Sequence, residues 1–525
     1  MLSRAKEIIF YRGRYKGKML EDSDCDKLEE LLKIDAQKGY VRDLQNVIYD
    51  LSQSDIDLIK LNKSNDFVDL PKGTLTNLQT VGVAYMYFAK NLVLGDSVGL
   101  GKTVEVCGLC NLLATKYMKE GKLFRFLYLT NKVSVPQAQD EMIRFTGDYV
   151  EKLFGLASNI DKFSRENREF INHSVVGSHS LLTSERFQEY LIRYKRENGC
   201  YPFDLLIVDE SGDVLTNSNT KTYKSALKVR DMMNRVILLN ATPFEKELGM
   251  FYNQINFVDS TFLPTKTAFS KEYEIKDYSG PYPVFSGNYK NQDKFRNLVS
   301  YRYLARTRKK AGAVMKNCTA DLVVVPLSPE QKELLKKTSM PNMVYDCPSY
   351  FGTGVETNEE TTPKLQALVK LITQDFKDAK SILVYSRYKE AQQCIQDILN
   401  EYDVESMILN GDSPQEERES VINCFKLGDL RVLITNVQKA LNFGNCDYCI
   451  FYGYDPNPSK MIQFEGRMTR TYNIENKHVV LLISKGKELN ALKNVVKKRA
   501  EASDIFAGSD YSCVLNLLLD SKELN

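Results

Sequence analysis

Apolar residues along the chain gather in short runs that alternate with helical patterns, and they do so in two separate blocks. The first block begins near residue 74, and the second extends from about 363 to 487. Strands that alternate with helices form a parallel sheet with helices on both faces, so an α/β fold with two sheets is predicted. The predicted strands are 92–96, 124–130, 173–179, 203–210 and 235–242 in the first block, and 381–386, 405–411, 430–436, 448–454 and 479–484 in the second.

Polar residues follow the first predicted strand in the segment DSVGLGKT, from Asp96 to Thr103. Ligands collect at the carboxyl ends of parallel strands, and glycines there let backbone amides surround an anion at a helix N-terminus. Lys102 is expected to reach the β- and γ-phosphates of ATP, and Thr103 to ligate Mg²⁺. Asp96 occupies the place of the first glycine in GxxxxGK[ST]. The segment therefore matches the helicase-type variant, with Gly99 and Gly101 in the turn.

Two adjacent carboxylates, Asp209 and Glu210, follow the apolar run LLIV at the end of another predicted strand. Asp209 is expected to hold the Mg²⁺ shell, while Glu210 orients and deprotonates the attacking water. Together with a phosphate loop about a hundred residues upstream, the pair predicts hydrolysis of a nucleoside triphosphate. Thr242, after the next apolar run, is expected to sense the γ-phosphate.

The second block contains no further phosphate loop, so its sheet is expected to close over the nucleotide held by the first. Its candidate residues lie in the segment QFEGRMTR, which ends at Arg470. Arg467 and Arg470 are three residues apart and share one helix face, where two guanidinium groups can neutralise charge on a transferring phosphoryl group. An arginine pair on a helix is more often a solvated face, but the accompanying motifs favour the catalytic interpretation.

Length and composition narrow the class of protein. A chain of 525 residues suggests roughly three or four domains, and 43% hydrophobic with 26% charged residues is typical of a globular protein. The net charge of +3 means that any nucleic-acid surface is a local basic face. No apolar run approaches the roughly 18 residues that span a bilayer, so we expect an intracellular protein. Two CxxC pairs, Cys107/Cys110 and Cys446/Cys449, could hold zinc, but their predicted helix and strand positions favour packing.

The first 70 residues have a basic, aromatic opening followed by amphipathic helical patterns. This composition predicts a small, mainly helical accessory region, 1–70. Such a region either grips phosphates and stacks on bases or simply presents a solvated face.

In their order, these motifs resemble those of the Swi/Snf-like family of superfamily two ATPases, over about residues 74–484. TNLQTVGVAYM resembles the adenine-proximal glutamine motif, with Gln79 in the glutamine position, and LLNATPFEKEL resembles the coupling motif. Three further segments resemble blocks that distinguish this family from general helicases: YLARTRKKA (303–311), PLSPEQKELL (326–335) and PKLQALVKLI (363–372). NGDSPQEERESVINCF (410–425) and QFEGRMTR complete the series.

The resemblance implies an ATP-dependent DNA translocase whose two RecA-like lobes close on ATP and step along duplex DNA. It divides the chain into lobe 1 (71–260), an interlobe insertion (261–325), lobe 2 (326–490) and a C-terminal helical tail (491–525). By position, Lys132, Ser180, Ser386 and Arg387 match segments that face nucleic acid in relatives. ATP and Mg²⁺ are the implied cofactors. The implied nucleotide-binding residues are Gln79, Gly99, Gly101, Lys102, Thr103 and Asp209, and the catalytic ones are Lys102, Glu210, Arg467 and Arg470.

The chain departs from the family pattern at Gly212, where relatives usually have histidine, and at Lys439 and Ala440, where they carry glycines. The first interpretation is a translocase on duplex or branched DNA. A strand-separating helicase on DNA or RNA is the second, although no separate wedge domain is evident. The departures motivate a third, an ATP-gated DNA-binding scaffold without productive translocation.

Only short segments flank the two predicted lobes, without the chromatin-reading domains of eukaryotic remodellers. This favours a bacterial or bacteriophage protein that acts in replication, recombination or repair. We expect a monomer in the cytoplasm, with a nuclear location left open, that works with replication or recombination proteins and not with a membrane.

Overall fold

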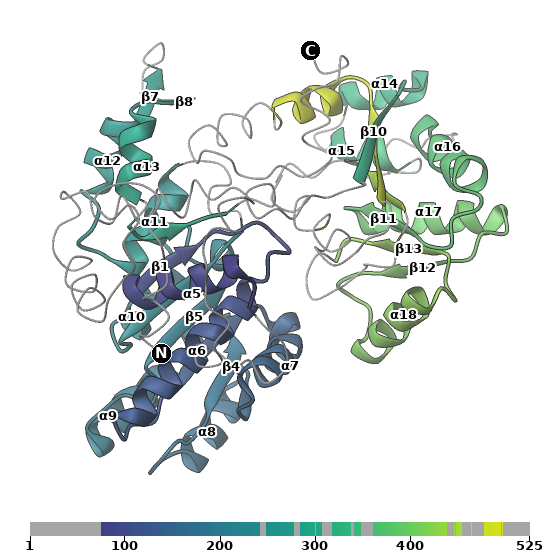
Figure 1. Ribbon diagram of the computed structural model, residues 1–525. Coiled ribbons are helices and arrows are strands. Elements are labelled where there is room, and N and C mark those ends of the chain that lie inside the picture. The colour runs from purple at the N-terminus through teal and green to yellow at the C-terminus, as the bar shows by residue number, and fades with distance from the viewer. Residues whose placement is uncertain are drawn as a thin grey trace. The chain divides into compact units, whose positions relative to one another are not determined.

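The computed structural model describes residues 75–241, 248–277, 284–299, 301–306, 318–337, 341–347, 361–437, 446, 448–453, 464, 477–494 and 496. This described chain forms two compact units, the first ending at Arg306 and the second beginning at Cys318 (Figure 1). None of the helices in these ranges is long and apolar enough to cross a membrane.

The first unit is built on a parallel sheet of order β3-β4-β2-β5-β6-β1-β9. Its apolar central strands are buried along nearly their whole length, as a sheet covered on both faces requires. The strands are β1 (Asn91–Leu94), β2 (Phe126–Thr130), β3 (Val150–Leu153), β4 (Ser174–Ser178), β5 (Leu205–Asp209), β6 (Arg235–Leu239) and β9 (Tyr303–Leu304).

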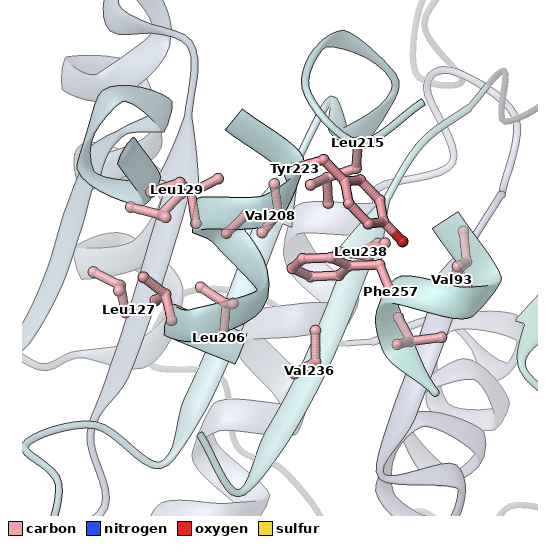
Figure 2. Packing of buried hydrophobic residues seen from close by; sticks show 14 of the residues in the cluster. Val93, Leu127, Leu129, Leu206, Val208, Leu215, Tyr223, Val236, Leu238 and Phe257 are labelled. Atoms are coloured by element: carbon pink, nitrogen blue, oxygen red, sulfur yellow. The ribbon is translucent and has the colours of Figure 1, made fainter. Parts of the chain in front are cut away.

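Two hydrophobic cores lie on the two faces of this sheet, because successive strand residues point to opposite sides. On β2, Phe126 and Tyr128 belong to one core, and Leu127 and Leu129 to the other, which Figure 2 shows. The helices are α5 (Asn77–Ala89), α6 (Lys102–Lys119), α7 (Val135–Thr146), α8 (Ala157–Glu166), α9 (Glu185–Asn198), α10 (Lys221–Arg230), α11 (Leu248–Val258), α12 (Lys266–Tyr273) and α13 (Gln292–Val299).

The second unit has a parallel sheet of order β10-β15-β14-β11-β13-β12, again with a core on each face. Its strands are β10 (Cys318–Val325), β11 (Ile382–Ser386), β12 (Ser406–Leu409), β13 (Val432–Thr435), β14 (Tyr448–Tyr452) and β15 (Lys477–Ser484). The helices are α14 (Pro329–Lys337), α15 (Pro341–Asp346), α16 (Pro363–Lys370), α17 (Lys389–Glu401) and α18 (Gln415–Leu427).

All ten strands predicted from the sequence are present, and the predicted α/β fold with two parallel sheets is confirmed. Sequence patterns missed β3, β9, β10 and the antiparallel hairpin of β7 (Glu274–Asp277) and β8 (Val284–Tyr289). Within the predicted interlobe insertion 261–325, β9 pairs with β1 in the first sheet, and β10 pairs with β15 in the second. The predicted domain boundaries stay predictions.

Candidate functional site

The phosphate loop lies between the end of β1 and the start of α6. Gly99 and Gly101 both have a φ of 86°, a conformation that favours glycine. Helix α6 begins at Lys102, and no side chain caps its first amides. The Lys102 ammonium donates a hydrogen bond to the carbonyl oxygen of Asp96 at 2.6 Å, so it lies across the loop. These amides and this cation are what an anionic phosphate requires.

Gln79 is attached to the same loop. Its side-chain amide donates to the carbonyl oxygen of Leu100 at 3.1 Å, and a Cβ on Gly101 would come within 2.5 Å of that amide nitrogen. The other end of the amide closes a capping box with Thr76 at the start of α5. Gln79 therefore fixes helix α5 against the phosphate loop, and its predicted contact with adenine stays a prediction.

The end of β5 brings the predicted metal ligands together. The Tyr128 hydroxyl on β2 donates to Oδ2 of Asp209 at 3.0 Å and is also hydrogen-bonded to Thr103. Burial holds the pKa of Tyr128 well above its ordinary value, so this hydroxyl remains a neutral donor. A hydroxyl and a carboxylate are hard oxygen donors and fit Mg²⁺, which takes few ligands from protein. The described residues contain no larger group of His, Cys, Asp and Glu suited to a metal.

Glu210 lies close enough to Lys102 for its charge to influence the pKa of the ammonium group. Burial lowers the pKa of Lys102, while the carboxylates of Glu210, Asp96 and Asp209 act in the opposite direction, Glu210 most strongly. Glu210 itself has a φ of 49°, which is uncommon for a residue other than glycine. Carboxylates and a lysine thus face a common space at the ends of β1 and β5.

The departure at Asp96 has a structural reason. Its two carboxylate oxygens share the Nε–H of Arg306, each at 3.0 Å, and Oδ1 also accepts from the Arg306 backbone amide at 2.9 Å. The same guanidinium contacts Glu105 on α6 and the carbonyl oxygen of Leu78 on α5. All three charged side chains are buried, and burial raises the pKa of Glu105 to about 8. We call Arg306, Asp96 and Glu105 the loop cluster.

A second buried network connects the ends of β5 and β6. The Ser211 hydroxyl and the Asn240 amide both donate to Oε1 of Gln254 on α11, each at 2.9 Å. A Cβ on Gly212 would lie 2.8 Å from the amide nitrogen of Asn240, so a side chain at 212 would have to displace this hydrogen-bonded amide. Thr242 lies outside the described residues.

Comparison with protein families matches the SNF2-related domain to residues 43–394, more than half of the chain. The chain belongs to the SNF2-related family. A helicase conserved C-terminal domain matches residues 363–472. Domains of these two kinds are those of ATP hydrolases, and the two parallel sheets are the RecA-like lobes expected of such an ATPase.

Curated relatives are distant. Mouse DNA repair and recombination protein RAD54B is 23% identical over 75% of this chain and 51% of its own length. The uncharacterized ATP-dependent helicase YqhH of Bacillus subtilis is 22% identical over 74% of this chain and 72% of its own. Among solved structures, the Sulfolobus solfataricus SWI2/SNF2 ATPase core in complex with dsDNA covers 87% of this chain and 97% of its own, at 17% identity and a TM-score of 0.40. The SNF2-related chain thus spans about half the length of RAD54B.

The residues predicted to face nucleic acid differ in exposure. Lys132 and Ser180 are exposed just after β2 and β4, which are neighbours in the first sheet of this SNF2-related chain. Ser386 ends β11 and is fully buried, and the partly exposed Arg387 lies over the ring of Tyr388. Arg467 and Arg470 lie outside the described residues.

Sequence reasoning missed three residues of this site. Tyr128 is one aromatic residue within an apolar strand, and Arg306 lay in a family block without an assigned role. The third is His179, whose Nε2 lies 2.8 Å from the carbonyl oxygen of Asp209. A polar residue just after a strand of the sheet was the available signal for His179.

Proposed function

We propose that this SNF2-related protein is a DNA-stimulated ATPase that translocates on duplex or branched DNA in replication, recombination or repair. The observation that carries the proposal is the convergence of Lys102, Thr103, Asp209 and Glu210 at the ends of β1 and β5. The name of the relative RAD54B includes DNA repair and recombination, which supports this setting. A bacterial or bacteriophage source and a monomeric state stay predictions.

Each residue at the site has a separate task. Lys102 and the amides at the start of α6 bind the phosphates of ATP, and Thr103 with Asp209 would hold Mg²⁺. When bound, Mg²⁺ neutralises charge on the phosphate oxygens. Glu210 orients the attacking water and takes its proton, and Arg467 with Arg470 neutralise charge that develops on the γ-phosphoryl group.

Duplex DNA is the proposed track. Lys132 and Ser180 lie on the surface at the carboxyl edge of the first sheet, where polar groups can bond phosphates of any sequence. From the second unit, the segment of Ser386 and Arg387 is the proposed contact. The N-terminal region 1–70 either contacts DNA or another protein, or presents a solvated face.

The test is ATP hydrolysis without nucleic acid and with single-stranded DNA, duplex DNA, branched DNA and RNA. Duplex or branched DNA should stimulate turnover most. Lys102→Ala should abolish it, and Glu210→Gln should lower kcat by about 100-fold or more while ATP still binds. Unchanged DNA-dependent turnover in Glu210→Gln would contradict the roles assigned here.

Two results would favour the alternatives. Stimulation by RNA or single strands alone, with ATP-dependent strand release from a forked duplex, would favour the strand-separating helicase. Tight DNA binding without turnover would favour the ATP-gated scaffold, and ATP-driven displacement of a triplex strand would exclude it.

A further inference from the structure

Glu210 has a backbone conformation that needs external support. Its φ of 49° and ψ of 46° place it in the left-handed region. A side chain with a Cβ is uncommon there, and such a residue keeps this conformation only where its surroundings hold it in place. The groups that hold Glu210 therefore determine where its carboxylate points.

Hydrogen bonds hold the peptide between Asp209 and Glu210 from both sides. The Glu210 amide donates to Oδ1 of Asp209 at 2.9 Å, and the Asp209 carbonyl oxygen lies 2.8 Å from Nε2 of His179. A carbonyl oxygen only accepts, so Nε2 of His179 must carry the proton. After this peptide, the Glu210 carbonyl accepts from the amide of Asp213 at 3.0 Å.

His179 reaches this peptide from a different part of the sheet. It directly follows β4, and β2 separates β4 from β5 in the strand order, so the imidazole spans the end of β2. The next residue is the exposed Ser180, which we propose as a DNA contact. A hydroxyl hydrogen bond of 2.7 Å joins Ser180 to Ser178, the last residue of β4. The surface segment and the imidazole thus belong to one short turn.

We propose that His179 is a positioning residue that holds Glu210 in its catalytic orientation and makes that orientation depend on the DNA-facing turn of Ser180. This inference rests on the proposed function and adds a route by which DNA stimulates hydrolysis. A shift of the turn moves the imidazole, and the imidazole moves the peptide that carries Glu210. Neither the Lys102 contact with the loop nor the Gln79 contact takes part in this route.

Three variants test the role of His179. His179→Ala removes the donor, His179→Gln keeps an N–H of comparable reach, and His173→Ala is the control. His173 lies just before the opposite end of β4, where it contacts Glu151 and Asn172. With duplex DNA, His179→Ala should lower kcat by about tenfold or more, since small misplacements of a catalytic group have effects of that size. The KM for ATP should stay within about twofold, because the phosphate loop is unchanged.

The controls separate positioning from a general loss of structure. His179→Gln should recover most of the DNA-stimulated kcat, and His173→Ala should keep the full value. The proposal would be overturned if His179→Ala had the same kcat and the same degree of stimulation by DNA as the unaltered protein. An equal loss in His179→Gln and His179→Ala would also overturn it, because the donor would then be irrelevant.

Hydrogen exchange provides a readout that does not depend on turnover. Amides of residues 209–213 should exchange faster in His179→Ala than in the unaltered protein or in His173→Ala. If the unaltered protein shows no DNA-stimulated hydrolysis, the proposed function fails, while this experiment still tests the support of Glu210. Unchanged exchange in His179→Ala would show that His179 does not hold the peptide.

Discussion

In the described part of each unit, a buried cation lies between two acidic side chains, and the comparison shows how a unit that carries the phosphate loop differs from the other one. In the loop cluster, Arg306 forms a fork over Asp96 and also reaches Glu105. In the second unit, Lys364 on α16 contacts Asp346 on α15 at 2.6 Å and Glu488 at 2.9 Å. We call Lys364, Asp346 and Glu488 the lysine cluster.

What each cluster supports is different. Asp96 belongs to the phosphate loop, so the loop cluster joins that loop to helices α5 and α6 and to the end of β9. The lysine cluster lies against the turn after β14, where a Cβ on Gly453 would be 3.1 Å from the Asp346 carboxylate. Arginine suits the first position because its planar fork binds several acceptors at once, whereas lysine acts as a point charge. The first cluster therefore shapes the candidate ligand site, and the second joins structural segments.

Arg306→Met should have the largest effect. It leaves the buried Asp96 carboxylate without its cation, so the first unit should lose about 3–5 kcal/mol of unfolding free energy. ATP binding should weaken as well, because Asp96 shapes the loop. Hydrogen exchange resolved by segment, with a titration of a fluorescent ATP analogue, measures both. The matched control is Arg302→Met, whose pair with Asp259 is partly exposed and should be worth about 1 kcal/mol or less. Equal effects of the two variants would contradict the role of the loop cluster.

Lys364→Met should have a smaller effect, confined to the second unit. It leaves two buried carboxylates, but burial already raises the pKa of Asp346 to about 7, so this group can take up a proton and relieve the repulsion. We expect a loss of about 2–3 kcal/mol in that unit. Nucleotide affinity in the absence of DNA should be unchanged. A loss of affinity as large as that of Arg306→Met would remove the distinction between the clusters.

The pH dependence of stability should distinguish the clusters further. The Glu105 carboxyl has a pKa of about 8 when folded and 4.5 as its ordinary value, so the folded state holds an extra proton between these values. The unfolding free energy of the first unit should therefore fall as pH rises from about 4.5 to about 8. The unfolding free energy of the second unit should likewise fall with rising pH because of Asp346, and this fall should end near pH 7. Glu105→Gln should flatten only the first profile and Asp346→Asn only the second, as measured by segment-resolved exchange at several pH values.

Tyr128→Phe should have the smallest effect, limited to the metal ligands. This variant loses one hydrogen bond to Asp209 and one to Thr103. The Mg²⁺ concentration needed for half-maximal nucleotide binding should therefore rise severalfold, equivalent to about 1 kcal/mol. A Mg²⁺ titration of ADP binding measures this. Tyr452→Phe is the control, because Tyr452 is a similarly buried strand tyrosine whose hydroxyl donates to the Asp346 carbonyl oxygen at 3.2 Å. An unaltered Mg²⁺ dependence in Tyr128→Phe would show that Tyr128 does not order these ligands.

The sequence by itself determined the parts of this protein that depend on local pattern. Apolar runs are sufficient to locate ten strands, because a strand buried on both faces must be apolar throughout. The sequence also identified candidate site residues, because the carboxyl end of a parallel strand is a recurrent ligand position. These residues are Gly99, Gly101, Lys102, Asp209 and Glu210. Two-residue β9 escaped prediction because so short a segment has no periodicity.

Only the tertiary structure decided which distant residues complete the site. Arg306 is 210 positions from Asp96, Tyr128 is 81 from Asp209, and His179 is 30 from the Asp209 carbonyl that it contacts. A lone polar residue within or after an apolar strand has no repeating pattern that would indicate its partner. Strand order brings β2, β4 and β9 to the edge where β1 and β5 end, and that order is set by packing of the whole sheet. Long-range packing therefore selected the supporting residues, whereas local sequence had already marked the residues proposed to react.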